Sequence, residues 1–396
     1  MNTTRPTPAA AAVLMLTIGM GAAPAAFADQ TRAFRQAFPA GGTVRLANLA
    51  GRVELVRGQG REVVVEATVH ADAGGETQKL LQGMKWVKSR DREGNEEWAL
   101  SYPVEKHRSY VYPREDRKGS DDMPAFLSFL DMSQTTTTYR GEKVKIYARP
   151  HGGAPTLFAD LRITLPAGSD VAFRNSVGPV RGGDLEGSLS VKTGSGDVQI
   201  ASYAGRLTVD TGSGDVVLGA ARGETSVDTG SGDVVVKRLI GNGSMDTGSG
   251  DVVVENVSAG RLAVDTGSGD VTVREGTAAH VLAETSSGSV RVIRVELEEL
   301  DAGTGSGDVV FQASLAKAKR VTAETGSGDV EIKGGPDASF DISSSHGSGE
   351  LEVGYADAAL RKSGKKVVGA KRGNGRTVIR VATGSGDCVI SPRERS

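Results

Sequence analysis

The chain has 396 residues, with 47 Lys and Arg against 49 Asp and Glu, which gives a formal net charge of −2 at pH 7. A nearly neutral, slightly acidic chain argues against nucleic acid as a partner. The only cysteine is Cys388, so no intrachain disulfide can form and stability must come from packing.

Residues 1–28 have the pattern of a secretory signal peptide. Arg5 is the only charged residue ahead of a small, apolar stretch from Ala9 to Ala26, and Ala26-Phe27-Ala28 resembles a cleavage site. The stretch is too short and weak for a stable membrane anchor, and no second apolar run follows. We therefore expect export to the periplasm, the cell surface or beyond, with no membrane span.

Residues 29–73 are predicted to form a first solenoid coil and N-terminal strands. From Val44 to Leu55 the sequence V-R-L-A-N-L-A-G-R-V-E-L alternates apolar and polar residues on both sides of a glycine. Arg61–His70 alternates in the same way. A period of two is typical of strands with one buried face.

Residues 74–159 interrupt this pattern and are predicted to form a small α/β insert. Leu80, Leu81, Met84 and Val87 recur at helical spacing, which predicts a short amphipathic helix over 76–88. Strands are expected over 97–102 and 143–148. A long polar connection lies between them, and it is either functional or mobile.

Both tryptophans and several other aromatic residues fall in this insert. Aromatic rings with polar groups suit carbohydrate or protein surfaces, so one hypothesis is a ligand surface. The alternative is that they cap the solenoid and protect its first coil from edge-to-edge pairing. The candidate ligand-surface residues are Trp86, Trp98, Tyr110, Tyr112, Phe126 and Phe129.

Residues 160–396 are organised by one repeated phrase. T-G-S-G-D-V begins at Thr193, Thr211, Thr229, Thr247, Thr266, Thr304 and Thr325, and T-G-S-G-D-C begins at Thr383. Degenerate copies begin at Asn175, Thr285 and His346, so that the steps are 18 to 21 residues, except for a last step of 37 that equals about two periods. Such a period is typical of a solenoid, whose repeats bury their apolar faces against their neighbours.

Each repeat is predicted to be a strand, a Gly-Ser-Gly bend and a second strand. Around Thr211, for example, Leu207 and Val209 precede the bend while Val216 and Leu218 follow it at alternate positions. Glycine allows a corner that needs positive φ or has no room for a Cβ. Cys388 takes a slot that holds valine elsewhere, which predicts a small buried hydrophobe rather than a nucleophile. The predicted fold is all-β, a single-stranded right-handed β-solenoid of about 12 stacked coils of 18–21 residues.

The acidic residue after each bend raises the question of metal binding. Stacked carboxylates about 5 Å apart repel one another, and Ca²⁺ could neutralise them. The candidates are Asp215, Asp233, Asp251 and Asp270. The alternative is that these are solvated turn residues that hydrogen-bond the bend backbone and discourage aggregation. In calcium-binding nonapeptide solenoids one residue separates Gly from Asp, whereas here they are adjacent.

No catalytic motif stands out. The five histidines are scattered and show no metal-ligand spacing. Glycosidic cleavage needs two placed carboxylates, whereas the acids here are repetitive, which favours a structural role. The sequence therefore predicts no enzyme, no catalytic residues and no cofactor other than a Ca²⁺ candidate.

The signal peptide, N-L-A-G-R-V-E-L at Asn48–Leu55, I-T-L-P-A-G at Ile163–Gly168 and the serial T-G-S-G-D-V coils together resemble the bacterial putative-adhesin family. That resemblance implies a β-solenoid domain of unknown function. Unlike the family pattern, this chain has a long insert that bears aromatic residues.

We expect an exported, non-enzymatic scaffold that binds an envelope glycan or protein surface. The alternatives are a β-helix that binds or processes polysaccharide, and an accessory of envelope-stress signalling.

Overall fold

The structure is a computed structural model, and it describes residues 30–39, 41–91, 93–113 and 134–393. The predicted signal peptide and the candidates Phe126 and Phe129 lie outside the described residues. The chain divides into two compact units, unit 1 up to Asp197 and unit 2 from Val198 onward. The described residues contain no helix that is both long enough and apolar enough to cross a membrane.

The described part of unit 1 contains one helix and many strands. In chain order these are β1 (Gln30–Pro39), β2 (Val44–Ala50), β3 (Val53–Gly58), β4 (Glu62–Ala71), α1 (Gly75–Gly83), β5 (Trp86–Arg90), β6 (Glu96–Leu100), β7 (Ser109–Val111), β8 (Gln134–Tyr139), β9 (Glu142–Tyr147), β10 (Leu157–Pro166), β11 (Ser169–Val177) and β12 (Val180–Ser195). The sequence did not reveal β1, which pairs antiparallel with β4.

The segment expected to form the first coil contains β2 and β3. β11 pairs in parallel with β2, so that Asn175 lies beside Asn48 in the slot that holds Thr in other coils. Both asparagines are fully buried. The Asn48 Nδ2 donates to the Asn175 Oδ1 (3.1 Å), and the Asn175 Nδ2 donates to the carbonyl oxygen of Gly51 (2.9 Å). These amides therefore join successive coils inside unit 1.

The insert differs in detail from its prediction. α1 ends at Gly83 rather than near residue 88, because Trp86–Arg90 is extended and pairs antiparallel with β6 as β5. β6 and β9 match the expected strands within a few residues. The threonine-rich stretch, which gave no clear signal, is β8 and pairs with β9.

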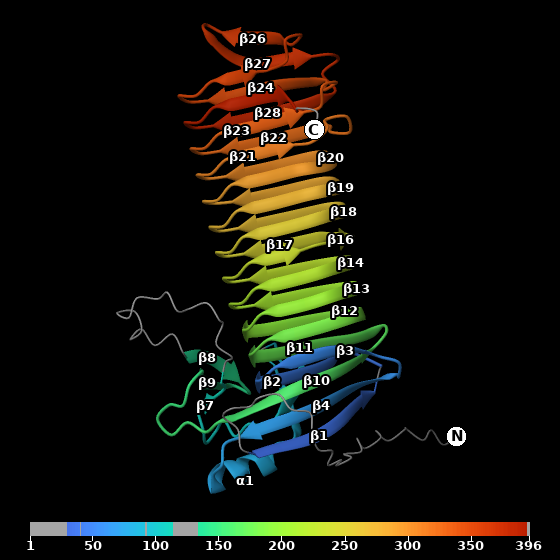
Figure 1. Ribbon diagram of the computed structural model, residues 1–396, viewed down its shortest axis with the longest axis vertical. Helices are drawn as coiled ribbons and strands as arrows, with labels where there is room; N and C mark the ends of the chain where they lie inside the picture. Colours follow the sequence, from blue (N-terminus) through green and yellow to red (C-terminus); the bar gives the residue numbers. More distant parts are fainter. Residues whose placement is uncertain (1–29, 40, 92, 114–133, 394–396) are drawn as a thin grey trace, which may run out of the picture. The chain divides into compact units, whose positions relative to one another are not determined.

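Unit 2 consists of strands. In chain order these are β13 (Val198–Thr211), β14 (Val216–Thr229), β15 (Val234–Val236), β16 (Leu239–Ile240), β17 (Gly243–Thr247), β18 (Val252–Thr266), β19 (Val271–Thr285), β20 (Val290–Thr304), β21 (Val309–Gln312), β22 (Arg320–Thr325), β23 (Val330–Gly334), β24 (Phe340–His346), β25 (Leu351–Val353), β26 (Ala359–Ser363), β27 (Lys366–Arg372), β28 (Thr377–Thr383) and β29 (Cys388–Pro392). Within unit 2 they stack one above another, as the yellow to red part of Figure 1 shows. The all-β, solenoid-like stack is confirmed.

The stack in unit 2 is held in parallel register. Val252 lies beside Val271 and Val264 beside Ala283, so each buried slot meets the same slot of the next coil. A hydroxyl ladder follows the bends: the Oγ1 of Thr266 donates to the Gly250 carbonyl oxygen, at 2.8 Å. Burial of alternate side chains, together with this ladder, joins neighbouring coils.

The bend glycines are required by close packing more than by backbone conformation. Gly232, Gly250 and Gly269 have no left-handed φ. A Cβ at Gly269 would lie 2.0 Å from the carbonyl oxygen of Gly250 in the preceding coil. Of the two reasons predicted for glycine, lack of room for a Cβ is the one that applies here.

The last coils do not stack in chain order. β28 pairs in parallel with β22 on one side and with β24 on the other. Likewise β29 lies between β23 and β25. The coil that begins its bend at Thr383 is therefore inserted between those of Thr325 and His346. Cys388, as predicted, is buried in this coil.

Candidate interaction surfaces

The aspartates after the bends form a hydrogen-bonded ladder. The Oδ1 of Asp215, Asp233 and Asp251 accepts the backbone N–H of the corresponding aspartate in the next coil, at 3.2, 2.9 and 2.8 Å. Asp270 accepts the Ser289 N–H at 2.8 Å. One carboxylate oxygen of each calcium candidate thus accepts a hydrogen bond from the backbone of the next coil, as the turn-residue alternative predicts.

Asp270 also has a cationic partner. The Arg291 Nη1 lies 2.6 Å from its Oδ2. The Ser289 backbone hydrogen bond, followed by Arg291, lowers the pKa of Asp270 despite partial burial. The described residues contain no group of three or more His, Cys, Asp or Glu arranged to hold a metal ion.

A second acidic column lies on the outward face of the strands, directly before the bend threonines. Parallel register places equivalent acids beside one another, and neighbouring strands are about 4.8 Å apart. Partial burial, followed by the charge of neighbouring carboxylates, raises the pKa of Asp228 and of Asp246. We name this set the acidic column, and its members are Asp210, Asp228, Asp246, Asp265 and Glu284.

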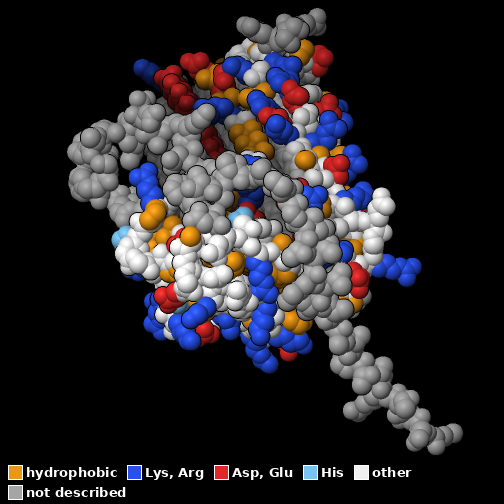
Figure 2. Space-filling view, turned by 60° about the horizontal axis from the view of Figure 1, so that its bottom comes forward, with side chains coloured by type: hydrophobic (Ala, Val, Ile, Leu, Met, Phe, Trp, Pro, Cys, Tyr) orange, Lys and Arg blue, Asp and Glu red, His pale blue; other side chains and the backbone are white. Residues whose placement is uncertain are grey.

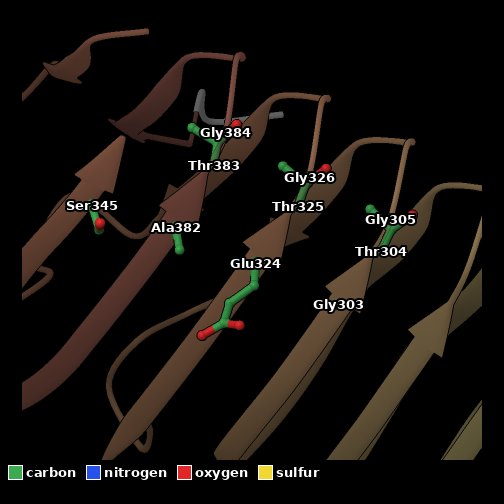
Figure 3. A pocket seen from close by; sticks show the side chains of 10 residues that line it. All are labelled: Gly303, Thr304, Gly305, Glu324, Thr325, Gly326, Ser345, Ala382, Thr383 and Gly384. Atoms are coloured by element: carbon green, nitrogen blue, oxygen red, sulfur yellow. The ribbon is translucent and has the colours of Figure 1, made fainter. Parts of the chain in front are cut away.

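Small residues interrupt that column further along unit 2. The next positions are Gly303, Glu324, Ala382 and Ser345, which line a shallow depression of about 440 Å³ together with bend residues. In Figure 3 the Glu324 carboxylate projects between the positions of Gly303 and Ala382. Among the residues that line the depression, Glu324 is the only charged one, so this site offers a single carboxylate rather than a convergent cluster.

The aromatic candidates are mostly inside unit 1. Tyr110 is fully buried, and Trp86 and Tyr112 are also buried. Trp86 packs edge-on against Phe38 at 6.1 Å between ring centroids. These three rings therefore form part of a core, which corrects the expectation of an exposed ligand surface. Among the described candidates only Trp98 keeps an intermediate exposure, and the Lys88 Nζ lies 5.7 Å from its ring centroid.

Two other tyrosines show what the insert does. The Tyr102 hydroxyl lies 3.2 Å from the Asn48 Oδ1, and the Tyr139 hydroxyl donates to the Ala47 carbonyl oxygen at 3.1 Å. β6 also pairs with β2. The insert thus covers the first coil, as the capping alternative predicts. Sequence reasoning counted both tyrosines among the insert aromatics but did not select them, because nothing local marks a hydroxyl that will meet a distant backbone.

An ion pair fastens the insert to the repeats of unit 1. The Arg174 Nη2 on β11 lies 2.6 Å from the Glu97 Oε1 on β6, and the Glu97 side chain is only 4% exposed. Desolvation raises the pKa of Glu97, and the attraction of Arg174 only partly offsets it. A buried pair of this kind contributes to geometry more reliably than to stability.

A hollow of about 330 Å³ lies beside the start of α1. It is lined on its polar side by Asp72, Glu76 and His107, and the His107 Nε2 lies 3.8 Å from the Glu76 Oε1.

Figure 2, which brings the bottom of the view forward, shows charged side chains of both signs interspersed over the visible surface. No single charge dominates there.

The histidines remain separate from one another, as the sequence predicts. His70 stacks on Phe158 and lies 3.2 Å from the Asp160 Oδ2, while the Nδ1 of His280 lies 3.1 Å from the Glu299 Oε2. His346 takes the threonine slot, with its Nδ1 2.9 Å from the Ser344 Oγ. Each of these three contacts is a local polar pair within the fold.

The comparisons with known proteins agree with the repeat pattern. Residues 222–391 match the family model described as Toastrack DUF4097, which confirms the resemblance to an adhesin-like domain of unknown function for this part of the chain. A search of curated proteins gave no match.

Two solved structures show a weak likeness. One, titled a putative cell adhesion protein from Clostridium sporogenes, is 8% identical with a TM-score of 0.20, covering 92% of this chain and 100% of that one. The other, titled a putative lipid binding protein from Parabacteroides distasonis, is 12% identical with a TM-score of 0.29, covering 90% of this chain and 96% of that one. Scores this low carry no argument about function.

Proposed function

We propose that this chain is an exported, non-enzymatic scaffold that binds an envelope glycan or protein through the outward faces of its stacked strands. The observation that carries the proposal is the acidic column in unit 2. Its carboxylates repeat at the strand spacing of about 4.8 Å on a rigid parallel stack. The Toastrack match over residues 222–391 supports an adhesin-like role for the same region.

The acidic column has polar neighbours that suit a repetitive partner. Two residues before Asp210, Asp228 and Asp246, the same outward face presents Thr208, Ser226 and Ser244, whereas apolar residues take this position before the other two acids. The carboxylates in these rows can accept hydrogen bonds from the hydroxyls of a sugar chain or the N–H groups of an extended peptide. The hydroxyl groups can both accept and donate such bonds. Many weak, regularly spaced contacts then add up along the stack.

The electrostatics of the column support binding rather than catalysis. A carboxylate pair that works as acid and base needs two pKa values pushed apart by different surroundings. Asp228 and Asp246 instead shift in the same direction and for the same first cause, their partial burial. Equivalent groups in equivalent surroundings suit a repeated contact surface.

The test is binding of the purified chain to an array of envelope glycans and, by cross-linking, to envelope proteins. We expect the double variant, Asp228→Asn together with Asp246→Asn, to bind its glycan or protein partner more weakly than the unmodified chain. Glu331→Gln with Glu352→Gln is the matched control, because these acids lie on outward positions of other strands. Equal loss in both variants, or release of glycan products by the unmodified chain, would contradict the proposal.

A second variant tests the insert while it keeps the buried tyrosines that the structure describes. Replacing residues 114–133 by a short Gly-Ser linker removes Phe126 and Phe129 but keeps the buried Tyr110, Tyr112 and Tyr139. We expect this variant to bind as the unmodified chain does. If binding disappears, the recognition surface belongs to the insert and not to the acidic column.

Calcium remains a separate hypothesis for the bend aspartates. Asp251→Asn keeps an oxygen that can accept the Asp270 N–H and removes the charge. If Ca²⁺ neutralises the ladder, Ca²⁺ should raise the melting temperature of the unmodified chain more than that of the variant. A melting temperature that is the same with Ca²⁺ and with chelator would remove the hypothesis.

A further inference from the structure

The largest excess of positive charge in the chain lies at residues 359–380, which we name the basic cap. This segment holds eight of the 47 Lys and Arg and no Asp or Glu, so the remaining sequence has 39 Lys and Arg against 49 Asp and Glu. The cap comprises β26, β27, the turns beside them and the first part of β28. Its charge is therefore opposite to that of the rest of the chain.

The strand pairing places the β26–β27 hairpin, with six of the eight cations of the basic cap, at the end of the stack in unit 2. β24 pairs antiparallel with β27, and β27 pairs antiparallel with β26. Among the described residues β26 has no other partner strand, and in Figure 1 it is drawn beyond β27 and β24. Seven of the eight cations are exposed, namely Arg361, Lys362, Lys365, Lys366, Lys371, Arg376 and Arg380.

Only part of this charge is used inside the fold. The Arg361 Nη1 lies 2.7 Å from the Asp341 Oδ1, and the Arg372 Nε lies 2.6 Å from the Asp357 Oδ1. Lys362, Lys365 and Lys371 make no ion pair with any described residue. Three lysines on one rigid hairpin are therefore available to an external anion.

Protection of a sheet edge explains some of these cations but not the whole surface. Lysines on an edge strand discourage pairing with another chain, and Lys362 on β26 fits that role. Yet Leu360 on the same strand is 48% exposed, and an exposed leucine on an edge favours association. Cations also come from the turn at Lys365 and from β27, away from the free edge.

We propose that the basic cap docks on an anionic lipid surface. Lysines near a membrane are attracted by acidic headgroups, and an apolar side chain among them can enter the boundary between headgroups and acyl chains. Lys362 and Lys365 supply the attraction on and beside the strand that carries Leu360, which supplies the apolar contact. Lys371 lies on the other face of the hairpin and adds to the positive charge. A soluble polyanion would use the lysines but would leave the leucine without a role. The proposal goes beyond the scaffold function and does not depend on the acidic column.

Co-sedimentation of the full chain with lipid vesicles tests this docking. We expect binding to vesicles of equal parts phosphatidylglycerol and phosphatidylcholine and none to phosphatidylcholine alone. Each cation near such a surface contributes about fivefold to the partition coefficient. Lys362→Gln with Lys365→Gln and Lys371→Gln should therefore weaken binding roughly a hundredfold, and about 1 M salt should abolish it in the unmodified chain.

A matched triple variant separates the basic cap from net charge. Arg222→Gln, Lys237→Gln and Arg238→Gln remove the same charge from exposed positions elsewhere in unit 2, and this variant should bind as the unmodified chain does. Leu360→Gln should weaken vesicle binding while circular dichroism stays unchanged.

Four outcomes would overturn the proposal. These are no binding to the acidic vesicles, equal binding to neutral ones, equal loss in the two triple variants, and capture by soluble heparin without capture by vesicles.

Discussion

The bend glycines can be tested at one position where the structure gives a large expected effect. A Cβ added at Gly269 would lie 2.0 Å from the Gly250 carbonyl oxygen and 2.9 Å from the Asp251 nitrogen. Both atoms belong to the backbone of the preceding coil and cannot rotate away. Gly269→Ala must therefore push two stacked coils apart by about 1.4 Å to restore an ordinary contact.

The cost of that displacement has two sources. Overpacking of a well-packed interior costs about 1–3 kcal/mol. The flanking hydrogen bonds, from the Gly269 N–H to the Thr266 Oγ1 at 3.2 Å and from the Thr285 Oγ1 to the Gly269 carbonyl oxygen at 2.8 Å, would also stretch. With about 1 kcal/mol for each bond, the free energy of unfolding should fall by about 3–5 kcal/mol.

Gly303→Ala is the matched control. Its added Cβ would have only the Glu284 Cγ as a neighbour, at 4.0 Å. The same chemical change should therefore alter stability by less than about 1 kcal/mol, and could raise it by restricting the unfolded chain.

The assay is urea denaturation followed by circular dichroism, with hydrogen exchange of peptides from 252–285. Exchange is needed because stacked repeats can open locally without global unfolding. We expect the backbone amides around the bends to exchange faster in Gly269→Ala than in the unmodified chain, and to be unchanged in Gly303→Ala. If the two alanine variants have the same stability, close approach between coils is not why this slot needs glycine.

Three further predictions concern single side chains. Thr266→Val should lower the free energy of unfolding by about 1–3 kcal/mol, because the carbonyl of Gly250 loses its buried donor. As a control, Thr272→Val on the outward face should change the free energy of unfolding by less than about 0.5 kcal/mol. Equal effects of the two substitutions would argue against the hydroxyl ladder. Because burial raises the pKa of Glu97, the unfolded chain releases this proton first, so stability should fall as the pH rises from about 4.5 to the higher pKa of the folded state. Glu97→Gln should remove this slope in melting temperature, and a slope of opposite sign would mean that Arg174 outweighs burial. Burial also raises the pKa of the Cys388 thiol, so a thiol reagent at pH 8 should modify no cysteine in the folded chain and one in urea; rapid labelling of the folded chain would contradict its place in the core.

The repeats were predictable because each coil carries the same information. Alternation fixes which side chains face inward, and a one-residue slip would expose every inward-facing valine of a strand. The slots around Thr211 and Thr266 therefore have the same structure. The acidic column is visible in the sequence for the same reason, since a fixed spacing in parallel register becomes a column in space.

The insert could not be predicted to the same extent because its contacts are not local. The hydroxyl of Tyr139 meets the Ala47 carbonyl oxygen 92 residues away. The predicted helix over 76–88 failed at its end because Trp86 pairs with Leu100 in β5 and β6, and sheet pairing outweighs helical spacing there. Aromatic composition alone does not distinguish a buried ring from a binding surface.

The position of the last coil shows a limit of repeat patterns that has a structural consequence. Because the repeats are so similar, any coil can pack against any other. Sequence similarity therefore does not decide whether the Thr383 coil lies beyond the His346 coil or before it. In unit 2 it lies before it, with β28 between β22 and β24. The end of the stack is thereby left to β24, β27 and β26, which pair antiparallel. Open parallel stacks need a terminal element that cannot accept another coil. An antiparallel hairpin without acidic residues meets that need.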